Sequence, residues 1–326
     1  MLFASEPPID LGYLVGLALG LIGIVMSAIA CGRLRETTLV APAAWAVASL
    51  GLLTYSCVFA GLTQFTHDNA AYAAELSTAS YLRYAAAAFV IVSTLAQLGA
   101  KSPQNGAWQF IVVTLVVVLL LPVVQGWAYG DESPIVHLLF RWLLLAHVFL
   151  GVGNYLFTRF ATSAILLGAG ELALIAEYLP FYAQPASRDR ELIGLGCLVA
   201  AVGFAWAVVL FRSRTDRSLE RLWGDFRDAY GAVWTLRIAE RLNVSARQHR
   251  WPVEFSWDGI AVTGEGRHGL PTTDLVGLEP ELQHRIEREL RSYFRRFVSH
   301  DWIARRLPSA AEAGTQPDAL ESEPRG

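Results

Sequence analysis

The stretch Trp108–Trp127, WQFIVVTLVVVLLLPVVQGW, holds no ionisable side chain. A helix of about 20 mostly apolar residues is long enough to cross a hydrocarbon core of about 30 Å. The sequence contains seven such stretches and therefore predicts an all-α membrane protein, a seven-transmembrane helix bundle over residues 1–212. The predicted spans are 11–31, 39–62, 79–98, 108–127, 135–157, 161–182 and 192–212.

Charged residues between the spans predict how the bundle is oriented. Connections on one side are rich in basic residues, whereas those on the other side are mainly acidic. Cytoplasmic loops of membrane proteins carry an excess of Lys and Arg. We therefore expect an integral protein of the cell (inner) membrane, with the N-terminus outside and the C-terminus cytoplasmic. The basic side holds Arg33, Arg35, Lys101, Arg159, Arg212, Arg214 and Arg217, and the other side holds Glu6, Asp10, Asp68, Glu75, Asp131 and Glu132 with Arg188 and Arg190.

Residues 213–307 predict a small cytoplasmic α-β-β-α domain. Apolar residues recur at spacings of three or four over 216–248 and again from Pro280 to about residue 306, a pattern typical of amphipathic helices. Pro280 also suits the first turn of a helix. The remaining residues, 308–326, lack periodicity, so we expect a disordered tail.

The segment VEFSWDGIAVTG at 253–264 predicts the β-hairpin of this domain. Asp258-Gly259 is typical of a two-residue turn, because glycine readily adopts positive φ. This turn pairs Trp257 with Ile260 and Phe255 with Val262, which places the apolar side chains on one side.

Four ionisable residues inside the fifth and sixth spans are the first candidates for function. The two spans are joined near Arg159. Arg141 and Glu177 each lie 18 residues from Arg159, and His147 and Glu171 each lie 12 residues from it. Each opposite-charge pair therefore falls at a matched depth. An ionisable group within a span is costly in lipid, so it usually faces protein or water.

Further polar residues lie at the depth of the outer pair. If their helix faces converge, they line a pocket open to the outside, and its excess of basic groups favours a small anionic ligand. The alternative is a set of salt bridges that holds the bundle together. The predicted ligand-binding residues are Thr54, Tyr55, Arg83, Tyr84, His137, Arg141, Glu177 and Tyr178.

The mid-membrane pair allows a second interpretation. His147 and Glu171, with Asn154 one heptad from His147, are candidates for a proton-linked site. The alternative is a buried polar pair with only a structural role.

The glycines of the first span form another pattern. Gly12, Gly16 and Gly20 are four residues apart and lie on one helix face, where a second backbone can approach closely. This face either packs inside the bundle or forms a homodimer contact.

Several chemistries are disfavoured by the residues present. The only lysine, Lys101, lies in a loop, which rules out a retinal Schiff base in the last span. Cys31, Cys57 and Cys197 all lie in spans without metal-ligand spacing. The histidines lack such spacing too, and the cytoplasmic domain has no glycine-rich phosphate loop, so the sequence predicts no metal or cofactor. Residues 212–306 hold 17 arginines against 14 acidic residues, too balanced for nucleic-acid binding but suited to anionic membrane lipid.

The residues present favour a non-enzymatic function without excluding an enzyme, and three functions are considered. The first is a receptor-like or sensory protein whose outward pocket signals to the cytoplasmic domain, which then contacts a protein partner. The second is a proton-coupled transporter that uses His147 and Glu171. The third is a scaffold subunit of a larger membrane complex.

Overall fold

The computed structural model separates the chain into two compact units, Met1–Arg212 and Ser213–Gly326. The predicted disordered tail lies outside the described residues, as does most of the loop before Pro280. The structure describes residues 11–62, 69–181, 188–211, 219–263 and 278–307.

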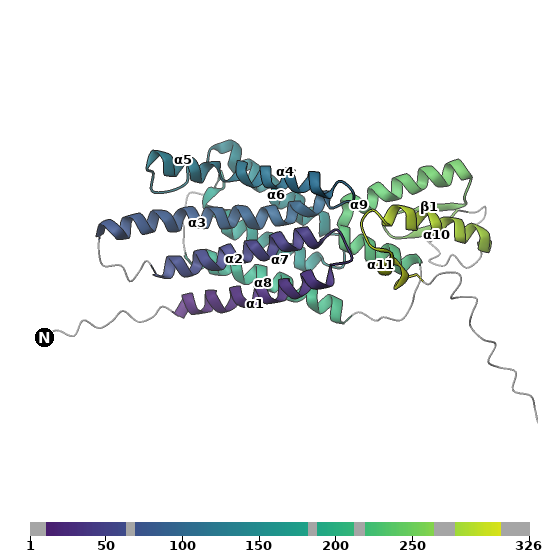
Figure 1. Ribbon diagram of the computed structural model, residues 1–326, viewed down its shortest axis with the longest axis horizontal. Helices are drawn as coiled ribbons and strands as arrows, with labels where there is room; N and C mark the ends of the chain where they lie inside the picture. The colour runs from purple at the N-terminus through teal and green to yellow at the C-terminus, as the bar shows by residue number, and fades with distance from the viewer. Residues whose placement is uncertain (1–10, 63–68, 182–187, 212–218, 264–277, 308–326) are drawn as a thin grey trace, which may run out of the picture. The chain divides into compact units, whose positions relative to one another are not determined.

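The first unit is a bundle of long apolar helices (Figure 1). Within the described part of the chain, seven helical segments are long and apolar enough to cross a membrane, which confirms the prediction of an all-α membrane protein. The bundle consists of α1 (Leu11–Arg33), α2 (Val40–Leu62), α3 (Asn69–Leu95), η2 (Ala96–Gly99), α4 (Asn105–Leu119), α5 (Leu121–Tyr129), α6 (Leu138–Tyr155), α7 (Ala161–Ile175), η3 (Ala176–Tyr178) and α8 (Arg188–Leu210).

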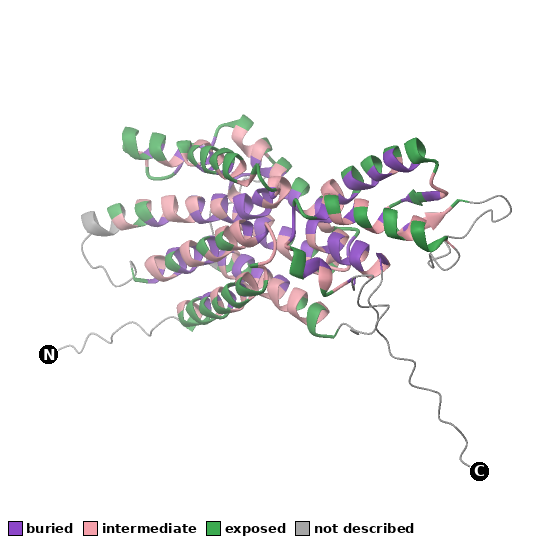
Figure 2. Cartoon of the chain, turned by 45° about the vertical axis from the view of Figure 1, so that its right-hand side comes forward, coloured by how far each residue is buried: buried purple, intermediate pink, exposed green. Residues whose placement is uncertain are grey.

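Helix α3 lies at the centre of the bundle and contacts α2, α4, α6 and α7. Its middle turns carry Ala86, Ala87 and Ala88, all fully buried or nearly so. Small side chains let several helices approach one backbone closely. Figure 2 shows the contrast between this buried segment and the largely exposed surface of α1. The start of α3 at Asn69 is ten residues earlier than predicted, because the alanine-rich NAAYAAEL segment favours a helix without being strongly apolar.

Two prolines, Pro122 and Pro180, interrupt the helices of the bundle. The fourth span is divided between α4 and α5 at Leu120, two residues before Pro122. Proline lacks the N–H that would continue the helix ladder, so it breaks or kinks the helix. The sixth span ends before Pro180, where Leu179 is already extended with φ −74° and ψ 145°.

Two residues of the predicted glycine face of α1, Gly16 and Gly20, pack against other helices of the same chain, which favours the alternative that this face packs inside the bundle. A Cβ built at Gly20 would overlap the Thr54 side chain on α2. A Cβ at Gly16 would meet Leu192 on α8 at 3.0 Å. The glycines therefore allow α1 to pack closely against α2 and α8.

The second unit contains two helices, a hairpin and a short final helix. Helix α9 is not the continuous helix predicted, because Gly231 has φ 71° and ψ −166°, which kinks it. Glycine adopts positive φ without the steric cost of a Cβ. The elements are α9 (Leu219–His249), β1 (Val253–Phe255), β2 (Ile260–Val262), α10 (Pro280–Phe294) and α11 (His300–Ala304).

The hairpin forms, but its predicted register is wrong by two residues. Phe255 pairs with Ile260 instead of Val262. A shift of two residues keeps each side chain on its own face, so Phe255 and Ile260 remain buried and Glu254 remains exposed. The observed pairs are Val253 with Val262, Glu254 with Ala261 and Phe255 with Ile260.

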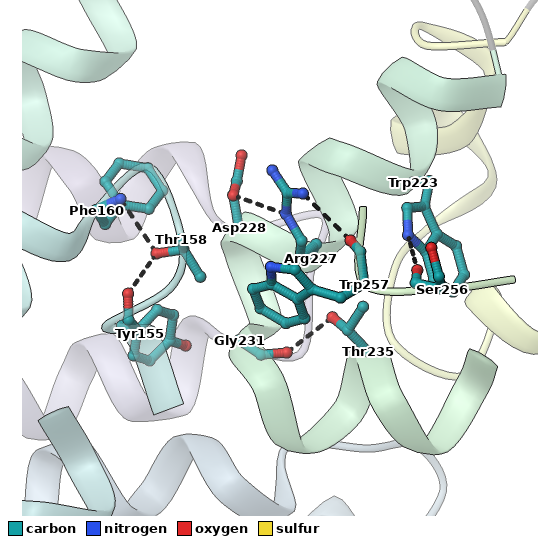
Figure 3. A network of polar contacts seen from close by, with 10 residues as sticks. All are labelled: Tyr155, Thr158, Phe160, Trp223, Arg227, Asp228, Gly231, Thr235, Ser256 and Trp257. Atoms are coloured by element: carbon teal, nitrogen blue, oxygen red, sulfur yellow. Dashed lines mark hydrogen bonds and ion pairs between the residues drawn. The ribbon is translucent and has the colours of Figure 1, made fainter. Parts of the chain in front are cut away.

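The tip of the hairpin explains the shift. The Ser256 N–H donates to the Gly259 carbonyl at 2.8 Å, which leaves Trp257 and Asp258 at the tip. The Arg227 guanidinium donates to the Trp257 carbonyl at 3.2 Å and lies 5.3 Å from the centroid of its ring (Figure 3). This contact comes from α9, so the local sequence does not reveal it.

Aromatic rings from α9 and α10 form the core of the second unit. The rings of Phe226 and Phe294 stack with centroids 4.2 Å apart, and the Tyr230 hydroxyl donates to the Phe297 carbonyl at 2.6 Å. Near the end of the described chain, Arg306 Nε donates to Asp225 Oδ2 at 2.7 Å. The last helix is thereby joined to the first helix of the unit.

Candidate functional site

Polar side chains from four elements gather at the end of the bundle where α1 begins. Here α2 ends, α3 begins, η3 follows α7 and α8 begins, because neighbouring spans in the chain run in opposite directions (Figure 1). We call this set of residues the polar cluster. It comprises Ser56 and Cys57 from α2, Arg83 and Tyr84 from α3, Glu177 and Tyr178 from η3, and Glu191 from α8.

Glu191 is the most deeply buried acid of the polar cluster, with only 5% of its surface exposed. Its Oε1 accepts a hydrogen bond of 2.9 Å from the Ser56 hydroxyl. The Cys57 thiol is a second neighbour of the same carboxyl group. Glu191 therefore links α8 to α2 through a polar contact inside an apolar bundle.

Arg83 supplies the positive charge of the polar cluster. It lies within electrostatic range of Glu191 and Tyr178. Its Nε is buried and has no hydrogen-bond partner among the described residues. A buried donor without a partner is costly, so this nitrogen is available to a molecule that offers an acceptor.

Two tyrosines lie beside Arg83. The rings of Tyr84 and Tyr178 meet edge to face, with centroids 4.9 Å apart. Tyr178 also neighbours the Glu177 carboxyl group. The Tyr84 residue is 1% exposed, and its hydroxyl has no hydrogen-bond partner within the described chain. A second buried donor thus accompanies Arg83 Nε.

The composition of the polar cluster differs from the predicted pocket in its charge. Arg141 Nε donates to the Val136 carbonyl at 2.9 Å, and no ion pair joins Arg141 to Glu177 in the described residues. His137 is exposed just before α6. With Glu191 included, two carboxyl groups accompany one guanidinium. The described residues of this cluster therefore lack the excess of basic groups from which the sequence predicted an anionic ligand.

Two further predicted residues also lie elsewhere. The Thr54 hydroxyl donates to the Leu50 carbonyl of its own helix at 2.7 Å, and its side chain packs against Gly20. Tyr55 is 55% exposed, so it points away from the interior of the bundle. Of the eight predicted ligand-binding residues, the structure brings together Arg83, Tyr84, Glu177 and Tyr178.

The mid-membrane residues do not form the predicted pair. His147 Nδ1 lies 2.5 Å from the Leu143 carbonyl of its own helix. Glu171 is fully buried, and neither carboxyl oxygen has a hydrogen-bond partner among the described residues. Thr94 is its polar neighbour, but the Thr94 hydroxyl donates to the Ile91 carbonyl at 2.7 Å. Asn154 is buried, with 4% of its surface exposed.

Sequence reasoning missed Glu191 because the predicted seventh span began at Leu192. Asp189 and Glu191 occupy the first turn of α8, where acidic residues commonly stabilise a helix N-terminus from its surface. The helix face distinguishes Glu191 from Asp189. Leu195 and Leu198, four and seven residues after Glu191, are both buried, so Glu191 lies on the buried face of α8.

The described residues contain no group of three or more His, Cys, Asp or Glu side chains that is suited to a metal ion. Comparison of the chain with protein-family models, curated proteins and solved structures finds no match. The function is therefore argued from the geometry of the polar cluster.

Proposed function

We propose that this protein is a receptor-like integral membrane protein whose polar cluster binds a small amine-bearing molecule. The observation that carries the proposal is a pair of buried donors that have no partner among the described residues, Arg83 Nε and the Tyr84 hydroxyl. They lie beside the carboxyl groups of Glu177 and Glu191. A zwitterion such as an amino acid matches both features. Its carboxylate accepts from Arg83 and Tyr84, and its ammonium group binds the carboxyl groups.

The distribution of basic residues supports an orientation in which the polar cluster faces the outside of the cell. The second unit then lies in the cytoplasm of a cell whose inner membrane holds the bundle. Glu191 is near the start of α8, and the chain leaves α8 after Leu210 toward α9. A helix of 23 residues is about 35 Å long and moves as one body. Displacement of Glu191 by a ligand thus alters the other end of α8, and the non-catalytic second unit passes the change to a protein partner.

The test measures the thermal unfolding temperature of the full chain in detergent with glycine, ethanolamine or acetate as probes. We expect glycine, which carries both an ammonium group and a carboxylate, to raise this temperature most, and ethanolamine and acetate, which carry one group each, to raise it less. Glu177→Gln and Glu191→Gln remove a carboxylate from the polar cluster and should abolish the increase. The matched control is Glu132→Gln, which changes an exposed carboxylate outside the cluster. Stabilisation by acetate alone, or equal stabilisation of the Glu191→Gln variant, rejects the proposal.

A second candidate function, proton-coupled transport, is favoured by Glu171. A carboxyl group that is fully buried without a hydrogen bond is costly to keep charged, so it is suited to gaining and losing a proton as the bundle changes conformation. The test is proton flux into proteoliposomes that contain a pH-sensitive dye. We expect flux through the parent protein and none through Glu171→Gln, and equal flux through both proteins rejects this role.

A further inference from the structure

Helix α10 has two distinct faces. Ile286, Leu290 and Phe294 are fully buried against the rest of the second unit. The opposite side is exposed along its whole length at the three- and four-residue spacing of one helix face. We call this side, together with the adjacent Arg296, the arginine face. It comprises Glu281, His284, Arg285, Arg288, Ser292, Arg295 and Arg296.

The charge of the arginine face is almost entirely positive. Its single acid, Glu281, already bonds to Arg285 with an N–O distance of 2.5 Å. The guanidinium groups of Arg288, Arg295 and Arg296 make no ion pair with any described residue. Three unneutralised guanidinium groups therefore project from one side of a short helix, without a partner in the part of the chain that the structure describes.

Other arginines of the second unit are used differently. Arg306 binds Asp225 and stacks over Trp302 with its Cζ 3.7 Å from the ring centroid. Arg291, on the flank of α10, donates to the Leu307 carbonyl at 3.3 Å. These two arginines stabilise the fold. Arg288, Arg295 and Arg296 make no comparable contact with the described residues, so their charge is available to an external anion.

The chain itself supplies an anionic surface within reach. Leu219, the first residue of α9, follows the last residue of α8 by nine positions, and an extended chain covers at most about 3.5 Å per residue. Because α8 is one of the seven apolar segments, the second unit is tethered close to a membrane surface. Basic connections indicate that this is the cytoplasmic surface, whose leaflet carries anionic lipid.

We propose that the arginine face of α10 binds anionic lipid headgroups of the membrane that holds the bundle. Guanidinium groups form forked, charge-assisted hydrogen bonds with phosphate oxygens. The tether raises the local concentration of the lipid surface, so a few arginines are sufficient for contact. The apolar face of α10 stays in the core of the unit, which makes this an electrostatic contact and not an inserted helix.

The test uses the full chain with Cys31, Cys57 and Cys197 replaced by Ala and a nitroxide attached at Ser292→Cys on the arginine face. The protein is reconstituted in nanodiscs of phosphatidylcholine alone or of phosphatidylcholine with phosphatidylglycerol. Electron paramagnetic resonance then measures how often a water-soluble paramagnetic reagent collides with the nitroxide. We expect several-fold fewer collisions in the anionic nanodiscs, and recovery at about 1 M salt, where the Debye length is about 3 Å.

Three variants separate the arginine face from overall charge. Replacing Arg288, Arg295 and Arg296 with Gln should restore the collisions in anionic nanodiscs, whereas replacing the same three with Lys should retain most of the protection. The matched control replaces three exposed arginines of α9 and its end, Arg241, Arg247 and Arg250, with Gln and should retain the protection. Equal loss in both Gln variants, or protection without anionic lipid, overturns the proposal. So does protection produced only by adding a soluble polyanion such as RNA.

Discussion

The Ser56 hydroxyl donates to the Glu191 carboxyl group at 2.9 Å and joins α2 to α8 across 135 positions of the sequence. Both residues are buried, with 0% and 5% of their surfaces exposed. Helices α2 and α8 also contact α1 on either side. The hydrogen bond therefore fixes the arrangement of three helices in addition to positioning a carboxyl group of the polar cluster.

Replacing Ser56 with Ala removes the donor and leaves the Glu191 oxygen buried without it. We expect a loss of about 1–3 kcal/mol in the free energy of unfolding, the usual cost of leaving a buried polar group unsatisfied. Thermal unfolding of the full chain in nanodiscs measures the loss. Ser77→Ala is the control, because that hydroxyl donates only to the Ala74 carbonyl of its own helix. An equal loss in both variants would contradict this role for Ser56.

Replacing Gly20 with Ala should disturb the contact between α1 and α2. The new methyl group would overlap Thr54, and overpacking of this kind typically costs about 1–3 kcal/mol. Adding Thr54→Ala to the same chain should recover part of the loss, since it removes the two closest atoms. Gly51→Ala has nothing within 4 Å and should be neutral or slightly stabilising. Thermal unfolding of the parent protein and these three variants forms the test, and a double variant no more stable than Gly20→Ala would refute it.

The Asn243 side chain forms hydrogen bonds with the hairpin backbone, as the backbone of a neighbouring strand would. Its Nδ2 donates to the Phe255 carbonyl at 2.8 Å, and its Oδ1 accepts from the Phe255 N–H at 2.7 Å. Asn243→Ala removes both bonds, so we expect faster amide hydrogen exchange in β1 and a loss of about 1–3 kcal/mol. Asn243→Asp keeps the acceptor, so its exchange rate and its stability should lie between those of the parent protein and of Asn243→Ala. Gln248→Ala, at an exposed position of α9, should leave exchange in β1 unchanged.

The ionisation of Glu281 should depend on Arg285. A hydrogen bond and the charge of Arg285 lower the pKa of the Glu281 carboxyl group below its ordinary value of 4.5. A carboxyl group with a lowered pKa in the folded state contributes its stabilisation fully above the unfolded value and loses it as pH falls through the folded value. Carboxyl ¹³C titration should show this lowered pKa, and Arg285→Gln should return it toward 4.5. A pKa unaffected by Arg285→Gln would show that the pair does not form in solution.

The apolar length of the spans was predictable because lipid requires every backbone polar group to be satisfied within the helix. The helix breaks at Pro122 and Pro180 were also predictable, since the N–H that proline lacks interrupts the helix whatever surrounds it. Counting from Arg159 assigns Arg141 and Glu177 to one depth, but it does not reveal which neighbour a helix face meets. The two residues form no ion pair in the described chain.

The hairpin shows the same division. Alternation along residues 253–262 predicted which side chains are buried, because successive residues of a strand point to opposite faces. In the observed register, Arg227 and Asn243, two residues of α9, bond to the hairpin backbone. Contacts between elements distant in the chain leave no periodic signal in either segment.

By itself, the sequence determined the membrane-spanning helices, their breaks and the amphipathic character of the second unit, since each follows from the solvent that surrounds a short stretch of chain. The tertiary structure decided which polar residues meet. It turned Thr54 toward Gly20, bonded Arg141 to Val136 just before its own helix and placed Glu191 beside Ser56. The rotation of each helix about its axis is set by packing against several neighbours at once, and only the assembled bundle contains that information.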